Sequence, residues 1–266
     1  MKVGFFDSGV GGITLLSYAR DNVAGEDYVF YADEDNVPYG VKTAEEIRKL
    51  THAAVSCLVD RGCKAVVIAC NTATSAAIEY LRKEFEGMPV IGIEPAVKPA
   101  VTHTGHRRVL VMATPLTVRE AKLKQLIDRF DHEGQVDLLP MPELVAFAES
   151  EEFTGGRVRD YIARSLSPFK LEEYSDLVLG CTHFNYFKDT MASLLPVSTE
   201  IIDGSAGTVN HLVRILESRG LAGGGSGKVE YLVSGRPAEH GSDFAGRAER
   251  MMSRAREMRK ITRGTL

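Results

Sequence analysis

Short apolar runs alternate along the chain with segments that carry apolar residues at helical spacing. The apolar runs are rich in β-branched side chains, which predicts strands buried on both faces. They cover residues 2–7, 28–33, 65–69, 89–93, 108–113, 135–140, 176–180, 199–203 and 228–234. The helical segments cover residues 43–61, 74–86, 117–130, 155–167, 184–195 and 205–219. This alternation is typical of an α/β protein with largely parallel sheets.

Two segments about 110 residues apart share one design. Residues 66–76 (VVIACNTATSA) and 177–187 (LVLGCTHFNYF) each contain an apolar strand, a cysteine, polar residues and a helix. The similarity predicts two related α/β halves that face each other, in place of one wide sheet. The glycine-rich residues 222–228 suit a flexible turn before the last strand.

Composition excludes some classes of protein. Of the 266 residues 44% are apolar, which is enough for a sizeable core, and the net charge of −4 gives no general attraction to nucleic acid or anionic membranes. No window approaches the roughly eighteen apolar residues of a membrane helix, so we expect a cytoplasmic protein. The four cysteines form no C-x-x-C pair. We therefore expect reduced thiols and no metal site.

Polar residues gather where the predicted strands end, and ligands of open α/β sheets collect at this edge. Asp7 and Ser8 end the first strand, and three glycines follow them. Thr14 stands where a G-x-G-x-x-G motif needs its third glycine, so a nucleotide site is weakly supported. Backbone amides at the start of the next helix still favour an anion, which is compatible with a small acidic substrate.

The four cysteines divide into two pairs. Cys57 lies in a helical segment and Cys63 in the turn before a strand, and both are interpreted as small core residues. Cys70 and Cys181 lie where a strand gives way to a helix, and a helix N-terminus lowers the pKa of a thiol. We therefore interpret Cys70 and Cys181 as reactive thiols.

Two reactive thiols in equivalent places suggest acid/base chemistry on both faces of one carbon. One thiolate removes a proton, and the opposite thiol delivers another, so that a stereocentre is inverted. Such a weak carbon acid needs hydrogen-bond donors on its carboxylate. The candidate donors are Asn71, Thr72, Thr114 and Thr182. A nucleophilic Cys181 activated by His183 is the alternative, but it leaves Cys70 without a role.

Five segments together resemble the signature segments of glutamate racemases, in the order in which that family has them. They are residues 3–12 (VGFFDSGVGG), 37–40 (VPYG), 66–77 (VVIACNTATSAA), 90–100 (VIGIEPAVKPA) and 177–184 (LVLGCTHF). The resemblance extends from residue 3 to about residue 209. His183 favours the glutamate branch, because aspartate enzymes tend to carry an acidic residue there. A racemase for aspartate or another acidic amino acid stays open as an alternative.

The resemblance implies an interconversion of L- and D-glutamate without a cofactor, which supplies D-glutamate for bacterial peptidoglycan. It also implies two α/β domains related by a pseudo-twofold axis, with the active site in the cleft between them. Residues 1–95 and 207–266 would form the first domain, and residues 96–206 the second. The family is commonly dimeric, so a homodimer is expected.

The resemblance also assigns roles to individual residues. Cys70 and Cys181 match the two catalytic cysteines, of which the first serves the D-enantiomer and the second the L-enantiomer. Asp7, Glu149 and His183 match residues that assist proton transfer. The substrate-binding positions are matched by Ser8, Pro38, Tyr39, Gly40, Asn71, Thr72, Thr114, Thr117 and Thr182.

Some positions depart from the family pattern. Phe184-Asn185 replaces a usual Tyr-Pro, Asn36 replaces an Arg, and Glu120 replaces a common Ser, which leaves substrate fit and regulation open. The tail at residues 247–264 has seven Lys/Arg against two Glu, so it could contact nucleic acid or an acidic protein. We favour a helix with a solvated charged face that packs its methionines inward. These are Met251, Met252 and Met258.

Overall fold

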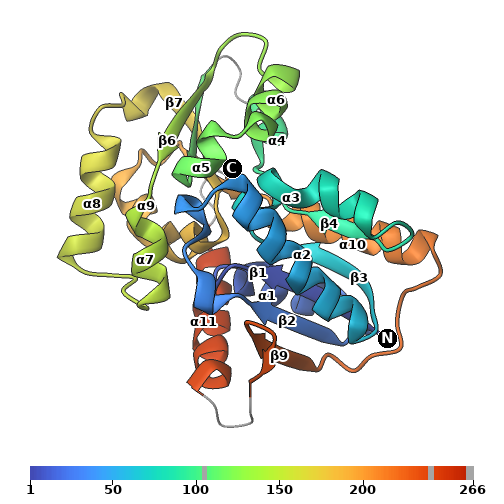
Figure 1. Cartoon of the computed structure of the whole chain (residues 1–266). Coiled ribbons are helices and arrows are strands. Elements are labelled where there is room, and N and C mark those ends of the chain that lie inside the picture. The colour runs from blue at the N-terminus through green and yellow to red at the C-terminus, as the bar shows by residue number, and fades with distance from the viewer. Residues whose placement is uncertain (104–106, 239–242, 262–266) are drawn as a thin grey trace.

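The computed structural model describes residues 1–103, 107–238 and 243–261, which form two separate sheets (Figure 1). The larger sheet has six strands in the order β10-β9-β2-β1-β3-β4. Its strands are β1 (Lys2–Asp7), β2 (Tyr28–Ala32), β3 (Cys63–Ile68), β4 (Val90–Gly92), β9 (Val229–Val233) and β10 (Arg236–Pro237). Every pairing in it is parallel except that of β9 with β10. The two-residue β10 was not predicted, and Cys63 begins β3 where a turn was expected.

The smaller sheet has four parallel strands in the order β6-β5-β7-β8. They are β5 (Arg108–Ala113), β6 (Val136–Pro140), β7 (Tyr174–Gly180) and β8 (Glu200–Asp203). When the four strands of this sheet are numbered by their order in the chain, they lie side by side as second, first, third and fourth. The first four strands of the larger sheet lie side by side in the same order. The prediction of two similar, largely parallel α/β halves is thereby confirmed.

Helices cover both faces of each sheet. Around the larger sheet lie α1 (Ile13–Asn22), α2 (Ala44–Asp60), α3 (Asn71–Glu84), α10 (Ser205–Ser218) and α11 (Asp243–Arg259). Around the smaller sheet lie α4 (Val97–His103), α5 (Pro115–Arg119), α6 (Ala121–Phe130), α7 (Glu143–Glu149), α8 (Gly156–Leu166) and α9 (Lys188–Leu194). In Figure 1, α2 and α3 lie in front of the larger sheet, whereas α7 and α8 lie on the side of the smaller sheet away from α4 and α6. Each half therefore has three layers.

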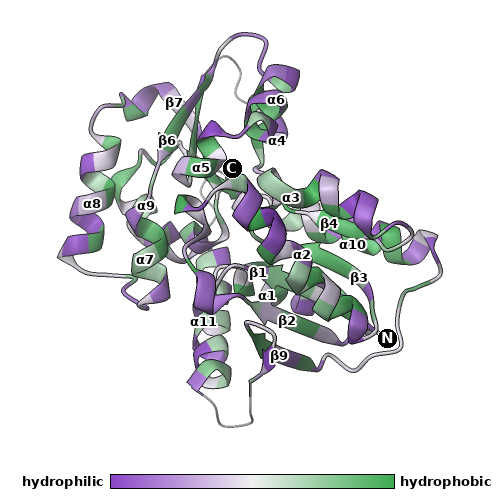
Figure 2. Ribbon diagram, viewed as in Figure 1, coloured by the Kyte–Doolittle hydropathy of each residue, from purple (hydrophilic) through white to green (hydrophobic). Residues whose placement is uncertain are grey.

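The core follows the two-residue period of the strands. Phe5 of β1 belongs to an apolar cluster with α1, α10 and α11, whereas its neighbour Phe6 packs into a cluster with α2 and α3. The first cluster continues into the smaller sheet through Leu110 and Met112 of β5. Figure 2 shows the hydrophobic strands enclosed by helices with hydrophilic outer faces. One continuous core therefore joins the two halves.

Short 3-10 helices occupy several of the loops between strands and helices. They are η1 (Glu34–Asn36), η2 (Tyr39–Val41), η3 (Leu171–Glu173) and η4 (Thr182–Phe187). The single helix predicted at residues 184–195 is in fact η4 followed by α9. The helix predicted at residues 117–130 is also two helices, because Glu120 has extended backbone between α5 and α6.

The tail forms α11, and its described part ends at residue 261, so residues 262–264 of the predicted basic segment lie outside the described residues. Met251, Met252 and Met258 are buried, as predicted. The expectation of a solvated charged face is wrong for Arg247 and Arg254, whose side chains are only 18% and 16% exposed and form ion pairs within the chain. No helix of the described chain is long and apolar enough to span a bilayer.

Candidate active site

The two candidate thiols follow topologically equivalent strands. Cys70 comes two residues after the end of β3 and Cys181 directly after β7, and each of these strands is the third of its sheet in chain order. Asp7 is the last residue of the neighbouring strand β1 and Thr114 follows the neighbouring strand β5, and these strands are the first of each sheet. The strand order reverses between the first and third strands, and this switch point is where open α/β sheets bind ligands.

Cys70 is the N-cap residue of α3. Its Sγ accepts a hydrogen bond from the Ala73 amide at 3.4 Å and lies 3.6 Å from the Ser8 hydroxyl. Burial, together with the negative charge of Asp7, raises the pKa of the Cys70 thiol to about 12. The predicted lowering by the helix N-terminus is therefore wrong for this structure, because burial outweighs the hydrogen bonds that Cys70 makes with Ala73 and Ser8.

Cys181 has extended backbone and is followed by the 3-10 helix η4, where an α-helix was predicted. Its buried Sγ lies 3.8 Å from Nδ1 of His183. The other ring nitrogen of His183, Nε2, lies 2.6 Å from Oε1 of Glu149. His183 therefore connects the thiol to a carboxylate.

His183 and Glu149 form a buried ion pair. Burial alone would lower the pKa of His183, but hydrogen bonds to Cys181 and Glu149 outweigh it and raise the pKa well above its ordinary value. Burial would raise the pKa of Glu149, but His183 and Arg247 hold it below its usual range. Both shifts favour an imidazolium beside a carboxylate. The nearby Glu151 does not contact His183; it pairs with Arg250 at 2.7 Å and, at 3.7 Å, with Arg247.

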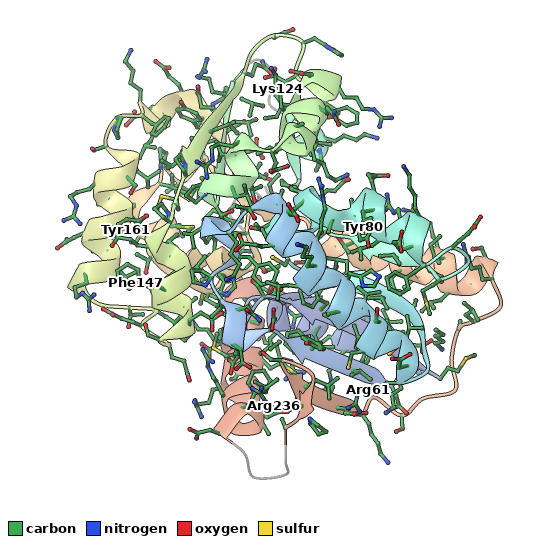
Figure 3. All side chains as sticks on the ribbon, in the orientation of Figure 1. Arg61, Tyr80, Lys124, Phe147, Tyr161 and Arg236 are labelled. Carbon is green, nitrogen blue, oxygen red and sulfur yellow. The ribbon has the colours of Figure 1, made fainter. Side chains whose placement is uncertain are left out.

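The short helix α7 carries Glu149, and ring packing holds this helix in place. Phe147 of α7 meets Tyr161 of α8 edge to face, with ring centroids 5.8 Å apart, and Figure 3 shows the two labelled side by side. The amide of Val10 donates to Oε1 of Glu149 at 3.0 Å. The glutamate is thus fixed from both halves of the molecule.

Asp7 acts on Cys70 through its charge and forms a hydrogen bond with the loop that follows Cys181. Its fully buried carboxylate accepts hydrogen bonds from the Gly9 amide at 3.1 Å and from the Thr182 hydroxyl at 3.3 Å. Burial raises the pKa of Asp7, although the charge of His183 and the backbone amides oppose the rise. Asp7 can therefore hold a proton more readily than an exposed aspartate.

Three threonines form a hydroxyl cluster between α3 and α5. The hydroxyl oxygens of Thr72, Thr114 and Thr117 lie 3.0 to 3.2 Å from one another. The buried Oδ1 of the adjacent Asn71 has no hydrogen-bond partner among the described residues. This group combines hydroxyl donors with an unused acceptor.

The loop at residues 38–40 lies beside this cluster. Pro38 is exposed and Gly40 is half-buried, and a Cβ on Gly40 would lie 3.1 Å from Cβ of Thr114. The buried Tyr39 donates from its hydroxyl to Asp33 at 2.6 Å. Its side chain is thereby anchored within the first half.

The glycines after Asp7 allow the two halves to approach closely. A Cβ on Gly9 would lie 1.9 Å from Oε1 of Glu149, and one on Gly11 would lie 2.4 Å from Nδ1 of His183. Close packing against these side chains thus accounts for both glycines without a bound nucleotide.

Sequence reasoning missed three residues around the site. Arg247 pairs with Glu149 at 2.9 Å, Asp33 accepts from Tyr39, and the buried hydroxyl of Tyr186 donates to the carbonyl of Val10 at 2.9 Å. Arg247 and Glu149 are 98 residues apart, and no local pattern signals such a contact. In the described part of the chain, no group of three or more His, Cys, Asp or Glu residues is arranged to hold a metal ion.

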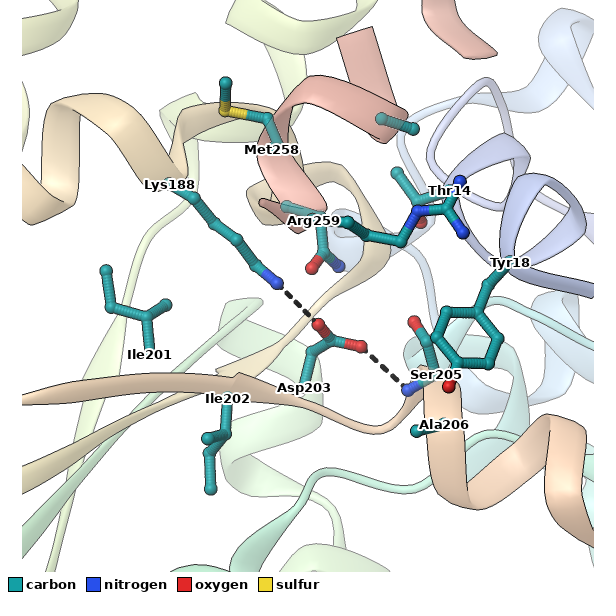
Figure 4. Close-up of a pocket in the computed structure, with 12 residues that line it drawn as sticks. Thr14, Tyr18, Lys188, Ile201, Ile202, Asp203, Ser205, Ala206, Met258 and Arg259 are labelled. Atoms are coloured by element: carbon teal, nitrogen blue, oxygen red, sulfur yellow. Dashed lines mark hydrogen bonds and ion pairs between the residues drawn. The ribbon is translucent and has the colours of Figure 1, made fainter. Parts of the chain in front are cut away.

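A separate pocket of about 250 Å³ is lined by residues of α1, η4, α9, β8, α10 and α11 (Figure 4). Lys188 and Asp203 form an ion pair in it at 2.7 Å, and Asp203 also accepts from the Ser205 amide at 2.7 Å. None of the predicted site residues lines this pocket. The pocket adjoins the segment that carries Thr182 and His183, because its lining residue Asn185 donates to the Thr182 carbonyl at 3.3 Å.

Comparison with known proteins adds evidence on the family. The chain is 49% identical to the glutamate racemase of Lachnospira eligens, over 98% of this chain and 100% of that one. It is 46% identical to glutamate racemase 2 of Bacillus subtilis, over 88% and 89%. The glutamate racemase of Francisella tularensis, solved in complex with D-glutamate, superposes with a TM-score of 0.80 at 26% identity, over 95% and 93%.

A further solved structure is similar over most of its length. The glutamate racemase of Escherichia coli, in complex with L-glutamate and the activator UDP-MurNAc-ala, gives a TM-score of 0.74 at 28% identity, over 87% of this chain and 98% of that one. The model of the Asp/Glu/Hydantoin racemase family matches residues 14–212. Because the family model matches most of the chain, and relatives align with it over nearly their whole length, the chain belongs to the Asp/Glu/Hydantoin racemase family.

Proposed function

We propose that this protein interconverts L- and D-glutamate with two cysteines and no cofactor. The observation that carries the proposal is the position of Cys70 and Cys181 after equivalent strands of two sheets whose first four strands have the same order. Its near full-length relatives are glutamate racemases, which supports glutamate as the substrate ahead of aspartate. The alternative of a Cys181 nucleophile gives Cys70 no role.

In the proposed reaction, the Cys181 thiolate removes the α-proton of L-glutamate, and the Cys70 thiol gives its proton to the opposite face of the resulting carbanion. The product is D-glutamate, and the reverse reaction exchanges the roles of the two thiols. The imidazolium of His183 stabilises the Cys181 thiolate by donating a hydrogen bond. The raised pKa of Cys70 fits a thiol that starts protonated.

Asp7 would assist Cys70. Its charge contributes to the raised pKa of Cys70, and its own raised pKa suits a group that exchanges a proton with that thiol. Glu149 would assist Cys181 by holding His183 protonated and oriented.

Substrate binding is proposed for further residues at the two switch points and for the loop at residues 38–40. The hydroxyls of Thr72, Thr114 and Thr117 can donate to a carboxylate, and the unpartnered Oδ1 of Asn71 can accept from an ammonium group. The other proposed contacts come from Ser8, Pro38, Tyr39, Gly40 and Thr182.

We further propose that residues 1–95 and 207–266 form one domain and residues 96–206 the other. The pairing of β9 with β2, and the packing of α11 on α1, support the return of the chain to the first domain. By extension from the family, we propose a cytoplasmic homodimer that supplies D-glutamate for peptidoglycan.

The function is tested with purified protein freed of pyridoxal phosphate. We expect L- and D-glutamate each to racemise, as followed by circular dichroism, and aspartate to react much more slowly. A preference for aspartate would refute the proposed substrate, and a strict need for pyridoxal phosphate would refute the cofactor-free mechanism.

A further inference from the structure

Arg247 of α11 binds the carboxylate on which His183 depends. Its Nη2 donates to Oε2 of Glu149 at 2.9 Å and also to the backbone carbonyl of Glu149. Its Nη1 donates to Oε1 of Glu34 in η1. The Arg247 side chain is only 18% exposed, so these contacts are largely shielded from solvent.

The two oxygens of the Glu149 carboxylate therefore serve different partners. Oε1 lies 2.6 Å from Nε2 of His183 and accepts from the Val10 amide, while Oε2 accepts from Arg247. A guanidinium that binds one oxygen and the carbonyl of the same residue fixes the rotation of the carboxylate. It thereby directs Oε1 at His183.

Glu149 lies among other acidic side chains, and the positive charge of Arg247 offsets their repulsion. His183 is close to Cys181, Glu149 of α7 and Asp7 of β1, and Glu149 also experiences the charge of Glu34. Without Arg247, the carboxylates of Glu34 and Glu149 would repel each other in a half-buried space. Glu149 would then move or take up a proton.

We infer that Arg247 is a positioning residue for Cys181, which it supports through Glu149 and His183. This inference rests on the proposed function, in which Cys181 acts on L-glutamate. Through Glu34, the same guanidinium ties α11 to the segment that leads into Pro38, Tyr39 and Gly40. The C-terminal helix thus connects the loop proposed to bind substrate with the residues proposed to move its proton.

The test compares Arg247→Gln with Arg250→Gln. Arg250 lies on the same helix and binds Glu151 through two hydrogen bonds, but its side chain is 61% exposed. Two quantities are measured: the titration of His183 by ¹⁵N NMR without substrate, and kcat/KM as a function of pH. Arg247→Lys tests whether a positive charge beside Glu149 restores the titration of His183 or the pH dependence of kcat/KM.

We expect Arg247→Gln to lower the pH at which His183 loses its proton, to shift the pH profile in the same direction, and to reduce kcat/KM by roughly 10- to 100-fold. The factor must be equal for both enantiomers, because they have equal free energies. Arg247→Lys should restore part of each loss, and Arg250→Gln should match the wild type. If Arg247→Gln does not fold, Arg247→Met keeps the apolar stem and takes its place.

A folded Arg247 variant with a wild-type His183 titration and pH profile would overturn the inference, even if its melting temperature fell. Equal effects from Arg250→Gln would also overturn it, since they would indicate a general effect of charge on α11. A wild-type protein that does not racemise glutamate would refute the proposed function alone. The NMR titration would still test the action of Arg247 on Glu149 and His183.

Discussion

The charge of His183 depends on its neighbours. It is buried, and burial alone would favour the neutral ring, but Glu149 and Cys181 hold it protonated. A protonated imidazole next to a thiol stabilises the thiolate that must abstract a proton from a weak carbon acid. The proposed reactivity of Cys181 therefore depends on the ion pair behind it.

Replacing Glu149 by Gln should change His183 from its protonated to its neutral form. The amide keeps the size of the side chain but removes its charge, so burial then lowers the pKa of His183. We expect ¹⁵N NMR to find a protonated ring in the wild type at pH 7 and a neutral ring in Glu149→Gln. A ring that is protonated at pH 7 in both proteins would contradict the role assigned to Glu149.

The raised pKa of His183 also predicts how the stability of the protein depends on pH. Because folding raises the pKa of His183, its charged form contributes stability that is complete below the unfolded value of about 6.5 and is lost as the pH rises through the folded pKa. The free energy of unfolding in urea, measured at stepped pH, should therefore decrease over this range. Glu149→Gln should show a smaller decrease.

Several of these residues were predictable from sequence, for different reasons. Cys70 and Cys181 were singled out because each ends a buried strand and is followed by polar residues. Glu149 was found only through resemblance to a family, since nothing in its local sequence marks it. Arg247 was missed because its role is created by a contact with Glu149, 98 residues away.

The strands were easier to predict than the helices. All nine predicted strands are present, because each is a short apolar run that the local sequence reveals. The expected burial on both faces is wrong for β6, β8 and β9, which are only partly buried. The seven-residue helices α4 and α7 were not predicted, since two turns are too short to display a helical period. The interruption at Glu120 was missed for a related reason: a helical period can continue across a break in the backbone.

The glycine-rich loop before β9 provides a test of how a buried charge supports an element. Lys64 of β3 pairs with Glu26 at 2.6 Å, and both side chains are almost fully buried. Lys64 also donates to the carbonyl of Gly223, and Glu26 accepts from the Gly223 amide. The loop was expected to be a flexible turn, yet this ion pair binds its backbone from both sides.

Lys64→Ala should leave the Glu26 carboxylate buried without its cation. We expect a loss of about 3 to 5 kcal/mol in the free energy of unfolding, measured by urea titration. Lys49→Ala, which breaks the exposed pair with Glu45, should cost no more than about 1 kcal/mol. A Lys64→Ala protein as stable as Lys49→Ala would show that the buried pair is not what holds the loop.

The two halves of the molecule act as one unit in this account. They share the order of their first four strands, a common apolar cluster, and hydrogen bonds from Thr182 to Asp7 and from Val10 to Glu149. The repeated strand-cysteine-polar design predicted the two halves, because each copy is local in sequence. How the halves meet was not predictable, since the contacts between Gly9 and Glu149 and between Gly11 and His183 exist only in the folded chain.

The central claim is that Cys70 and Cys181 act on opposite faces of one carbon, and solvent deuterium exchange tests it most directly. In deuterium oxide, Cys70→Ala and Cys181→Ala are incubated separately with L- and D-glutamate, and loss of the α-proton is followed by ¹H NMR. We expect neither variant to racemise at a rate above about 1% of the wild type. Cys70→Ala should exchange the α-proton of L-glutamate only, and Cys181→Ala that of D-glutamate only. Racemisation at the wild-type rate by either variant, or exchange of both enantiomers by a single variant, would contradict the two-thiol mechanism.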